Sequence, residues 1–118
     1  MFVGVARVVI QIPGARSLKD RRSVVRSFKD RVRARLKISV AEVGDAEAWQ
    51  LATFGLAVVS SDRGQCEEVI QSARSIAAAL PDALLTDVRT EVISFGPAGS
   101  RLARGLESED EGVEDDGE

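Results

Sequence analysis

The chain has 118 residues, a length typical of one domain, and its formal net charge at pH 7 is −3. It holds one cysteine, Cys66, and no histidine, which excludes an internal disulfide and removes the commonest metal ligand and proton shuttle. No apolar run approaches the roughly 18 residues of a membrane span, and no signal-peptide pattern opens the chain, so we expect a cytoplasmic protein without a membrane partner.

The first predicted element is a strand over residues 2–12. Its apolar and mixed side chains alternate, which is typical of a strand with one face in a core. The expected core face holds Ala6, Val8, Ile10 and Ile12, and the opposite face holds Arg7, Val9 and Gln11.

The second element is a long helix over residues 17–37. Ser17 is a candidate N-cap, and Asp20 can reach back to the open backbone N–H groups. Apolar residues recur at helical spacing along one face. These residues are Leu18, Val25, Phe28, Val32 and Leu36.

A basic stripe runs beside that apolar face. At about 100° per residue its members fall within roughly a quarter of the helix circumference. They are Lys19, Arg22, Arg26, Lys29, Arg33 and Lys37. We expect Arg21, Arg31 and Arg35 to widen this basic surface.

The remaining elements are two strands, a helix and a last strand. Short strands at residues 38–43 and 49–60 predict an antiparallel hairpin, with Phe54 facing the core. Asp62, with Gln65 three residues later, begins a second helix that Pro81 ends. A final strand covers residues 84–95.

The order β-α-β-β-α-β predicts an α+β, ferredoxin-like domain over residues 1–97: a four-stranded antiparallel sheet with both helices on one face. Residues 98–118 form a C-terminal tail, expected to be disordered, in which residues 107–118 carry eight acids and no base. Residues 1–40, by contrast, carry eleven Lys and Arg against two Asp. A local basic face can bind polyanions although the whole chain is acidic.

Phosphate binding is the function that this basic surface favours, because Arg and Lys release counterions from a nucleic-acid backbone. The simpler alternative is a solvated helix face that keeps a small protein soluble. No aromatic pair lies on the central strands, so bound RNA would contact the helix and not a sheet platform. The candidate phosphate-binding residues are Arg16, Lys19, Arg22, Arg26, Lys29, Arg33 and Lys37.

Two other functions stay open. The loop of residues 13–17 opens a helix, as in an acylphosphatase-like enzyme, but the chain contains no Asn and no convergent acid, base and nucleophile. The uncovered sheet face around Val9 and Trp49 is a candidate homodimer interface, with Trp49 as a packing anchor in the core or at that contact.

Three further polar residues receive structural interpretations. Glu42 is expected to pair with an Arg of the first helix, near Ser39 at the hairpin. Cys66 is expected to be inert because no basic residue is fixed beside it. We expect no catalytic residue, no metal and no cofactor.

The chain resembles the YlxP-like family of small bacterial proteins over nearly all of residues 1–95. The motifs that carry the resemblance are Ile12-Pro13-Gly14-Ala15-Arg16-Ser17-Leu18-Lys19, Arg21-Arg22, Ser39-Val40-Ala41-Glu42-Val43, Trp49-Gln50 and Gly55. The resemblance implies a ferredoxin-like fold, a gene neighbourhood with translation initiation factor two and a ribosome-binding factor, and a role in ribosome maturation or translation. It supplies no catalytic residues. Leu36-Lys37 stands where the family often has Phe-Asn, and the acidic tail exceeds the usual family length.

These observations together predict a non-catalytic protein associated with ribosomal RNA or a ribosomal subunit. It would bind phosphates through the basic helix, without base-specific contacts.

Overall fold

Seven elements follow one another in the computed structural model, which describes residues 1–97 and 99–100. They are β1 (Phe2–Gln11), α1 (Leu18–Arg35), β2 (Ser39–Glu42), β3 (Leu51–Ser60), α2 (Arg63–Ala78), β4 (Leu84–Gly96) and β5 (Gly99–Ser100).

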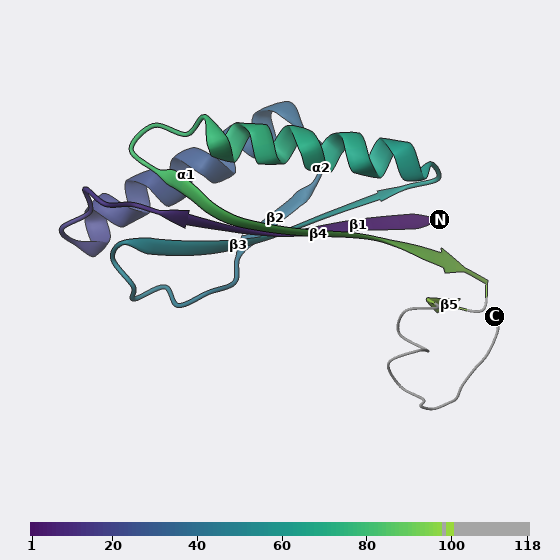
Figure 1. Cartoon of the computed structure of the whole chain (residues 1–118), viewed down its shortest axis with the longest axis horizontal. Coiled ribbons are helices and arrows are strands. Elements are labelled where there is room, and N and C mark those ends of the chain that lie inside the picture. Colours follow the sequence, from purple (N-terminus) through teal and green to yellow (C-terminus); the bar gives the residue numbers. More distant parts are fainter. Residues whose placement is uncertain (98, 101–118) are drawn as a thin grey trace.

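All neighbouring strands pair antiparallel, in the order β2-β3-β1-β4-β5. Both helices lie against the same face of this sheet (Figure 1). The expected ferredoxin-like arrangement is therefore confirmed. The short strand β5 extends the sheet beyond the expected domain boundary at residue 97, and the remainder of the expected acidic tail lies outside the described residues.

Hydrogen bonds explain where the helices begin. The Ser17 hydroxyl accepts from the Asp20 N–H at 3.2 Å, and the Asp20 carboxylate accepts from the Arg16 N–H at 3.0 Å. The first bond satisfies a donor that the first turn of the helix leaves open, and the second ties the residue before the N-cap to that turn. In α2 the Asp62 carboxylate accepts from the Gly64 N–H at 3.0 Å, so Asp62 caps the helix without the expected Gln65 contribution.

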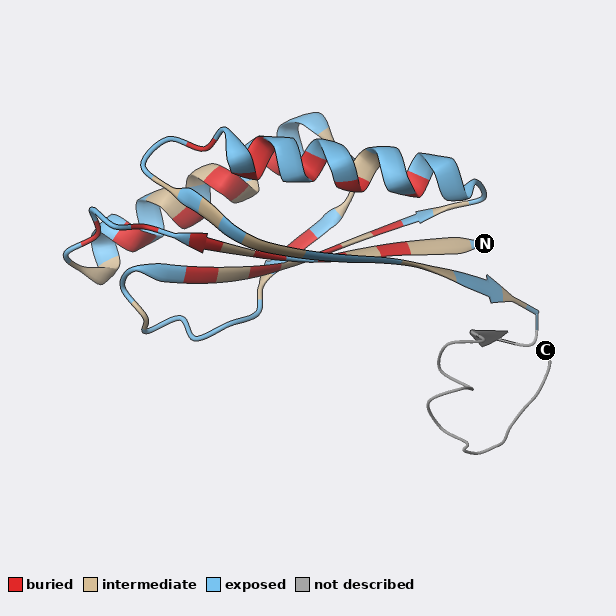
Figure 2. Cartoon of the chain, in the orientation of Figure 1, coloured by how far each residue is buried: buried red, intermediate tan, exposed pale blue. Residues whose placement is uncertain are grey.

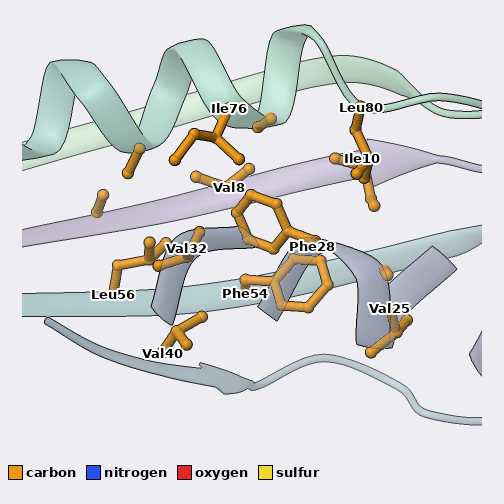
Figure 3. Close-up of a cluster of buried hydrophobic side chains, with 14 of the residues drawn as sticks. Val8, Ile10, Val25, Phe28, Val32, Val40, Phe54, Leu56, Ile76 and Leu80 are labelled. Carbon is orange, nitrogen blue, oxygen red and sulfur yellow. The ribbon is translucent and has the colours of Figure 1, made fainter. Parts of the chain in front are cut away.

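The core fills the layer between the helices and the sheet. Figure 2 shows buried segments on the sides of both helices that face the strands. Phe28 of α1 and Phe54 of β3 are both 0% exposed, and their ring centroids lie 4.6 Å apart at an interplanar angle of 50°. Side chains from β1, β2 and α2 surround this pair (Figure 3). The alternation in β1 is confirmed, because Val8 and Ile10 are buried and Arg7 is exposed.

Gly4 permits the close approach of α2 to β1. A Cβ atom built on Gly4 would lie 2.7 Å from Ile70 Cδ1, 3.0 Å from Val58 Cγ1 and 3.2 Å from Cys66 Cβ. Adding a methyl group to this packed site forces side chains or backbone to shift.

We therefore expect Gly4→Ala to lower the free energy of unfolding by about 1–3 kcal/mol. Urea denaturation would show this loss as a lower midpoint at an unchanged slope. Gly14→Ala is the matched control, since a Cβ on Gly14 meets no atom within 4 Å. Equal midpoints for the two variants would contradict the packing role of Gly4.

Candidate nucleic-acid interface

The basic stripe of α1 lies mainly on the surface. Arg22, Arg26 and Arg33 are exposed, and Lys29 is half-buried. The stripe is exposed because the neighbouring side of the helix supplies Val25, Phe28 and Val32 to the core. The helical spacing therefore separates an apolar side from a cationic side.

Four members of the stripe line one groove between α1 and the edge strand β2. The groove has a volume of about 450 Å³, and its lining residues are Arg22, Val25, Arg26, Lys29, Asp30, Arg33 and Glu42. Arg33 is directed towards the strand, since its Nη2 donates to the Val40 carbonyl at 3.4 Å. Within residues 1–97, the ion pairs shorter than 4.0 Å involve none of these four cations. The groove thus presents four positive charges with no ion-pair partner from the described chain.

Arg21 does not belong to the basic surface, and the expectation that it widens this surface is wrong. The residue is 2% exposed. Its guanidinium ion-pairs with Glu42 and donates to the carbonyls of Ala48, Leu51 and Asp45, with Nη2 to oxygen distances of 3.1 Å to Leu51 and 3.3 Å to Asp45. The expected pairing of Glu42 with an arginine of the first helix is confirmed. Because the Glu42 carboxylate is already paired with Arg21, it neutralises little of the positive charge of the four groove cations.

Gln50 joins the two loops at the same end of the sheet. Its side-chain amide donates to the carbonyls of Pro13 at 3.2 Å and Ala15 at 3.3 Å. The backbone carbonyl of Gln50 accepts from the Ile12 N–H at 2.9 Å. The loop that precedes α1 is therefore fixed to the β2–β3 connection. Sequence reasoning did not assign this role to Gln50, and a glutamine flanked by polar loops carries no local signal for it.

The ends of the predicted phosphate-binding set lie outside the groove lining. Arg16 and Lys19 flank the start of α1, and Lys37 follows the C-cap Leu36, whose extended backbone leaves the helical path. The structure therefore brings the middle of the set together and leaves its two ends apart.

A larger cavity, of about 660 Å³, lies beside the loop before α1. Its lining is mostly apolar, and the charged residues in it are Asp20 and Asp82. The lining includes neither Arg16 nor Lys19. Carboxylates repel a phosphate ester, so the cavity offers little to the enzyme hypothesis. Among the described residues, no group of three or more His, Cys, Asp or Glu is placed to hold a metal ion.

Trp49 is not in a strand and is not in the core. It lies in the connection between β2 and β3 and is 51% exposed, so the core alternative for Trp49 is wrong, and a homodimer contact stays a prediction. Residues 43–50 were partly expected in strands, but the Arg21 contacts hold them in a loop on the side of the sheet away from the helices (Figure 1). Val9 is half-buried on that same uncovered side.

Cys66 is fully buried, with its Sγ 3.8 Å from the Phe2 carbonyl.

Comparison with known proteins shows the family to which the chain belongs. A family model described as "Protein of unknown function (DUF503)" matches residues 3–90. The chain is 35% identical over 90 residues to "Uncharacterized protein YlxP" of Bacillus subtilis (strain 168), and the alignment covers 76% of this chain and 98% of that protein. None of the helices in residues 1–97 is long and apolar enough to cross a membrane.

Two designed proteins are among the similar solved structures. The de novo designed protein Foldit4 has a TM-score of 0.48 at 10% identity, over 80% of this chain and 98% of that one. The de novo designed protein LFR1 1, described as having a ferredoxin fold, has a TM-score of 0.46 at 17% identity, over 77% and 87%.

Proposed function

We propose that this chain, which belongs to the DUF503 family, is a non-catalytic accessory protein that binds RNA phosphates on a ribosomal subunit through the groove between α1 and β2. The observation that carries the proposal is the row of four cations, Arg22, Arg26, Lys29 and Arg33, along one groove. Their only acidic neighbours in the lining are Asp30 and Glu42, and Arg21 pairs with the second of these.

The spacing of the four cations suits a polyanion. Arg33 lies eleven positions after Arg22, which corresponds to about 16 Å along a helix axis. A charged row of this length can meet several successive phosphates of one strand. Phosphate contacts position a protein on nucleic acid without reading its sequence, so we expect little base specificity.

The test is co-sedimentation with separated ribosomal subunits over a series of salt concentrations. We expect the wild type to bind with an affinity that falls steeply as salt rises. Reversal of Arg22, Arg26, Lys29 and Arg33 to Glu removes four phosphate contacts, which should flatten the salt slope by about three to four log units per log unit of salt.

The matched control reverses four cations on the α2 side, namely Arg31, Arg35, Arg63 and Arg74. Arg31 and Arg35 lie on the same helix but line a different groove, against α2. This control has the same net charge as the first variant, and it should keep most of the wild-type slope. Equal losses in both variants, or no binding by the wild type at low salt, would contradict a role for the α1–β2 groove.

A further inference from the structure

The second face of the sheet has no helix over it (Figure 1). The strand registers place every second residue on this side, opposite the core. We call it the uncovered face, and its apolar members are Val3, Val5, Val9, Val43, Leu51, Ala57, Val59, Leu84, Ile93 and Phe95. One-sided antiparallel sheets usually carry polar residues on the side that meets water, so this composition requires an explanation.

Exposed large hydrophobic residues concentrate here. Val59 is 63% exposed, Val43 57% and Phe95 44%. Trp49, which is 51% exposed, lies in the loop before β3, two residues before Leu51 of this face. Met1 is 58% exposed and lies opposite Phe95 at the end of this face, since the backbone groups of the two residues bond to one another. Arg7 and Arg89 lie between the apolar residues near Phe95 and those near Leu51, so the face has two exposed apolar groups. Exposed apolar surface of this extent marks an interaction surface.

The charges on the uncovered face balance. Arg7 lies 3.6 Å from Asp87, and Arg89 lies 3.5 Å from the same carboxylate, while Glu91 is the next charged residue on that side of β4. Two cations and two anions give the patch no net charge. A strongly acidic or basic partner gains nothing from it, whereas a second copy related by a twofold axis can place each sign against its opposite.

The size of the face also suits a dimer. Ten residues of β1 extend for about 33 Å, and the four strands beside one another cover about 19 Å. The area of the sheet plane is therefore roughly 600 Å² per chain, and protruding side chains add to the surface that can be buried. Stable interfaces bury about 800 Å² per partner, which this face reaches when side chains interdigitate.

We propose that two copies of the chain pair through their uncovered faces. The two sheets would pack about 10 Å apart, with the helices on the outside of both. The dimer is then a four-layered structure in which the two sheets meet through their uncovered faces. The surface is separate from the α1–β2 groove, so the proposal stands or falls independently of RNA binding.

Analytical ultracentrifugation of the full chain over a concentration series tests the proposal. We expect the wild type to have the mass of two chains at micromolar concentration. Val59→Lys should give the mass of one chain, because the dimer would bury an unpaired ammonium from each copy. Val59 is largely exposed in the single chain, so the substitution should leave folding intact. Ala78→Lys, at an exposed position of α2, should remain a dimer.

Trp49 provides a second readout, since it is the single tryptophan and the chain has no tyrosine. Dilution of the wild type should shift Trp49 emission to longer wavelength as the dimer separates and water reaches the indole. Val59→Lys should show the long-wavelength emission at every concentration. A wild type that stays monomeric, a Val59→Lys variant that stays dimeric, or a dimer whose dissociation leaves the emission unchanged would each overturn this assignment.

Discussion

Arg21→Ala should lower the free energy of unfolding by about 3–5 kcal/mol, the range measured when one partner of a buried ion pair is removed. Arg21 and Glu42 have side chains only 3% and 18% exposed. Removal of the guanidinium leaves the Glu42 carboxylate partly buried without its partner. It also leaves the carbonyls of Ala48, Leu51 and Asp45 without a donor that the native structure supplies.

Arg22→Ala is the control for this prediction. Arg22 is the next residue in the same helix, is exposed, and makes no ion pair within the described chain. Its substitution should change the free energy of unfolding by no more than about 0.5 kcal/mol. Urea denaturation of both variants separates the buried role from the surface role. A loss below about 1 kcal/mol in Arg21→Ala would mean that water replaces the guanidinium without penalty.

The double variant Arg21→Met with Glu42→Leu isolates the charge pair from the packing. Apolar replacement of both partners often recovers the stability that a single replacement loses. We expect the double variant to be more stable than Arg21→Ala. It should nevertheless have a mobile β2–β3 connection, because the methionine cannot donate to the three carbonyls. Faster amide exchange in residues 43–50 would record that loss.

Phe54→Ala should also cost about 3–5 kcal/mol of unfolding free energy, since it opens a cavity at the centre of the core. Phe54 lies opposite Val8 in the sheet and directly beneath Phe28 of α1. The centroid separation of 4.6 Å is within the range of favourable aromatic pairs. Calorimetry or urea denaturation would measure the loss.

A double-mutant cycle of Phe28 and Phe54 should give a coupling energy of about 0.5–1.5 kcal/mol. Val59→Ala, in the same strand but on the uncovered face, should cost less than about 1 kcal/mol in a dilute, monomeric sample. If the two losses simply add, the rings contribute through area alone and not through their mutual contact.

The periodicity of β1 and α1 predicted the fold because burial follows the repeat of each element. Alternation at period two identified Val8 and Ile10 as core, and spacing at three and four identified Val25, Phe28 and Val32. The same spacing places Arg21 on the apolar face of α1, because it lies three residues after Leu18 and four before Val25. We nevertheless predicted an exposed Arg21, because a charged residue is seldom buried unless it has a partner. That partner, Glu42, is distant in the sequence.

The β2–β3 connection illustrates what local patterns cannot supply. Trp49 has a high strand propensity, and propensity alone extends β3 to this residue. The structure begins β3 at Leu51 because the Arg21 side chain of α1 binds carbonyls of this segment, and the Gln50 side chain donates to carbonyls of the loop before α1. Such contacts join residues 27–37 positions apart, and no window along the sequence contains both partners. The groove between α1 and β2 depends on the same long-range packing. The sequence therefore predicted the row of cations on the helix but not the strand that completes the groove.

The sheet order has a consequence for the timing of folding. β1 is a central strand, flanked by β3 on one side and by β4 on the other, and the Met1 ammonium donates to the Phe95 carbonyl at 2.9 Å. β1 therefore obtains its last neighbour only when residues 84–96 have been synthesised. Until then one edge of β1 lacks its hydrogen-bonding partners, and contacts of such long sequence separation form slowly. Completion of the domain is thus a late, cooperative event, and a chain that ends at residue 80 still has one unpaired edge on its central strand.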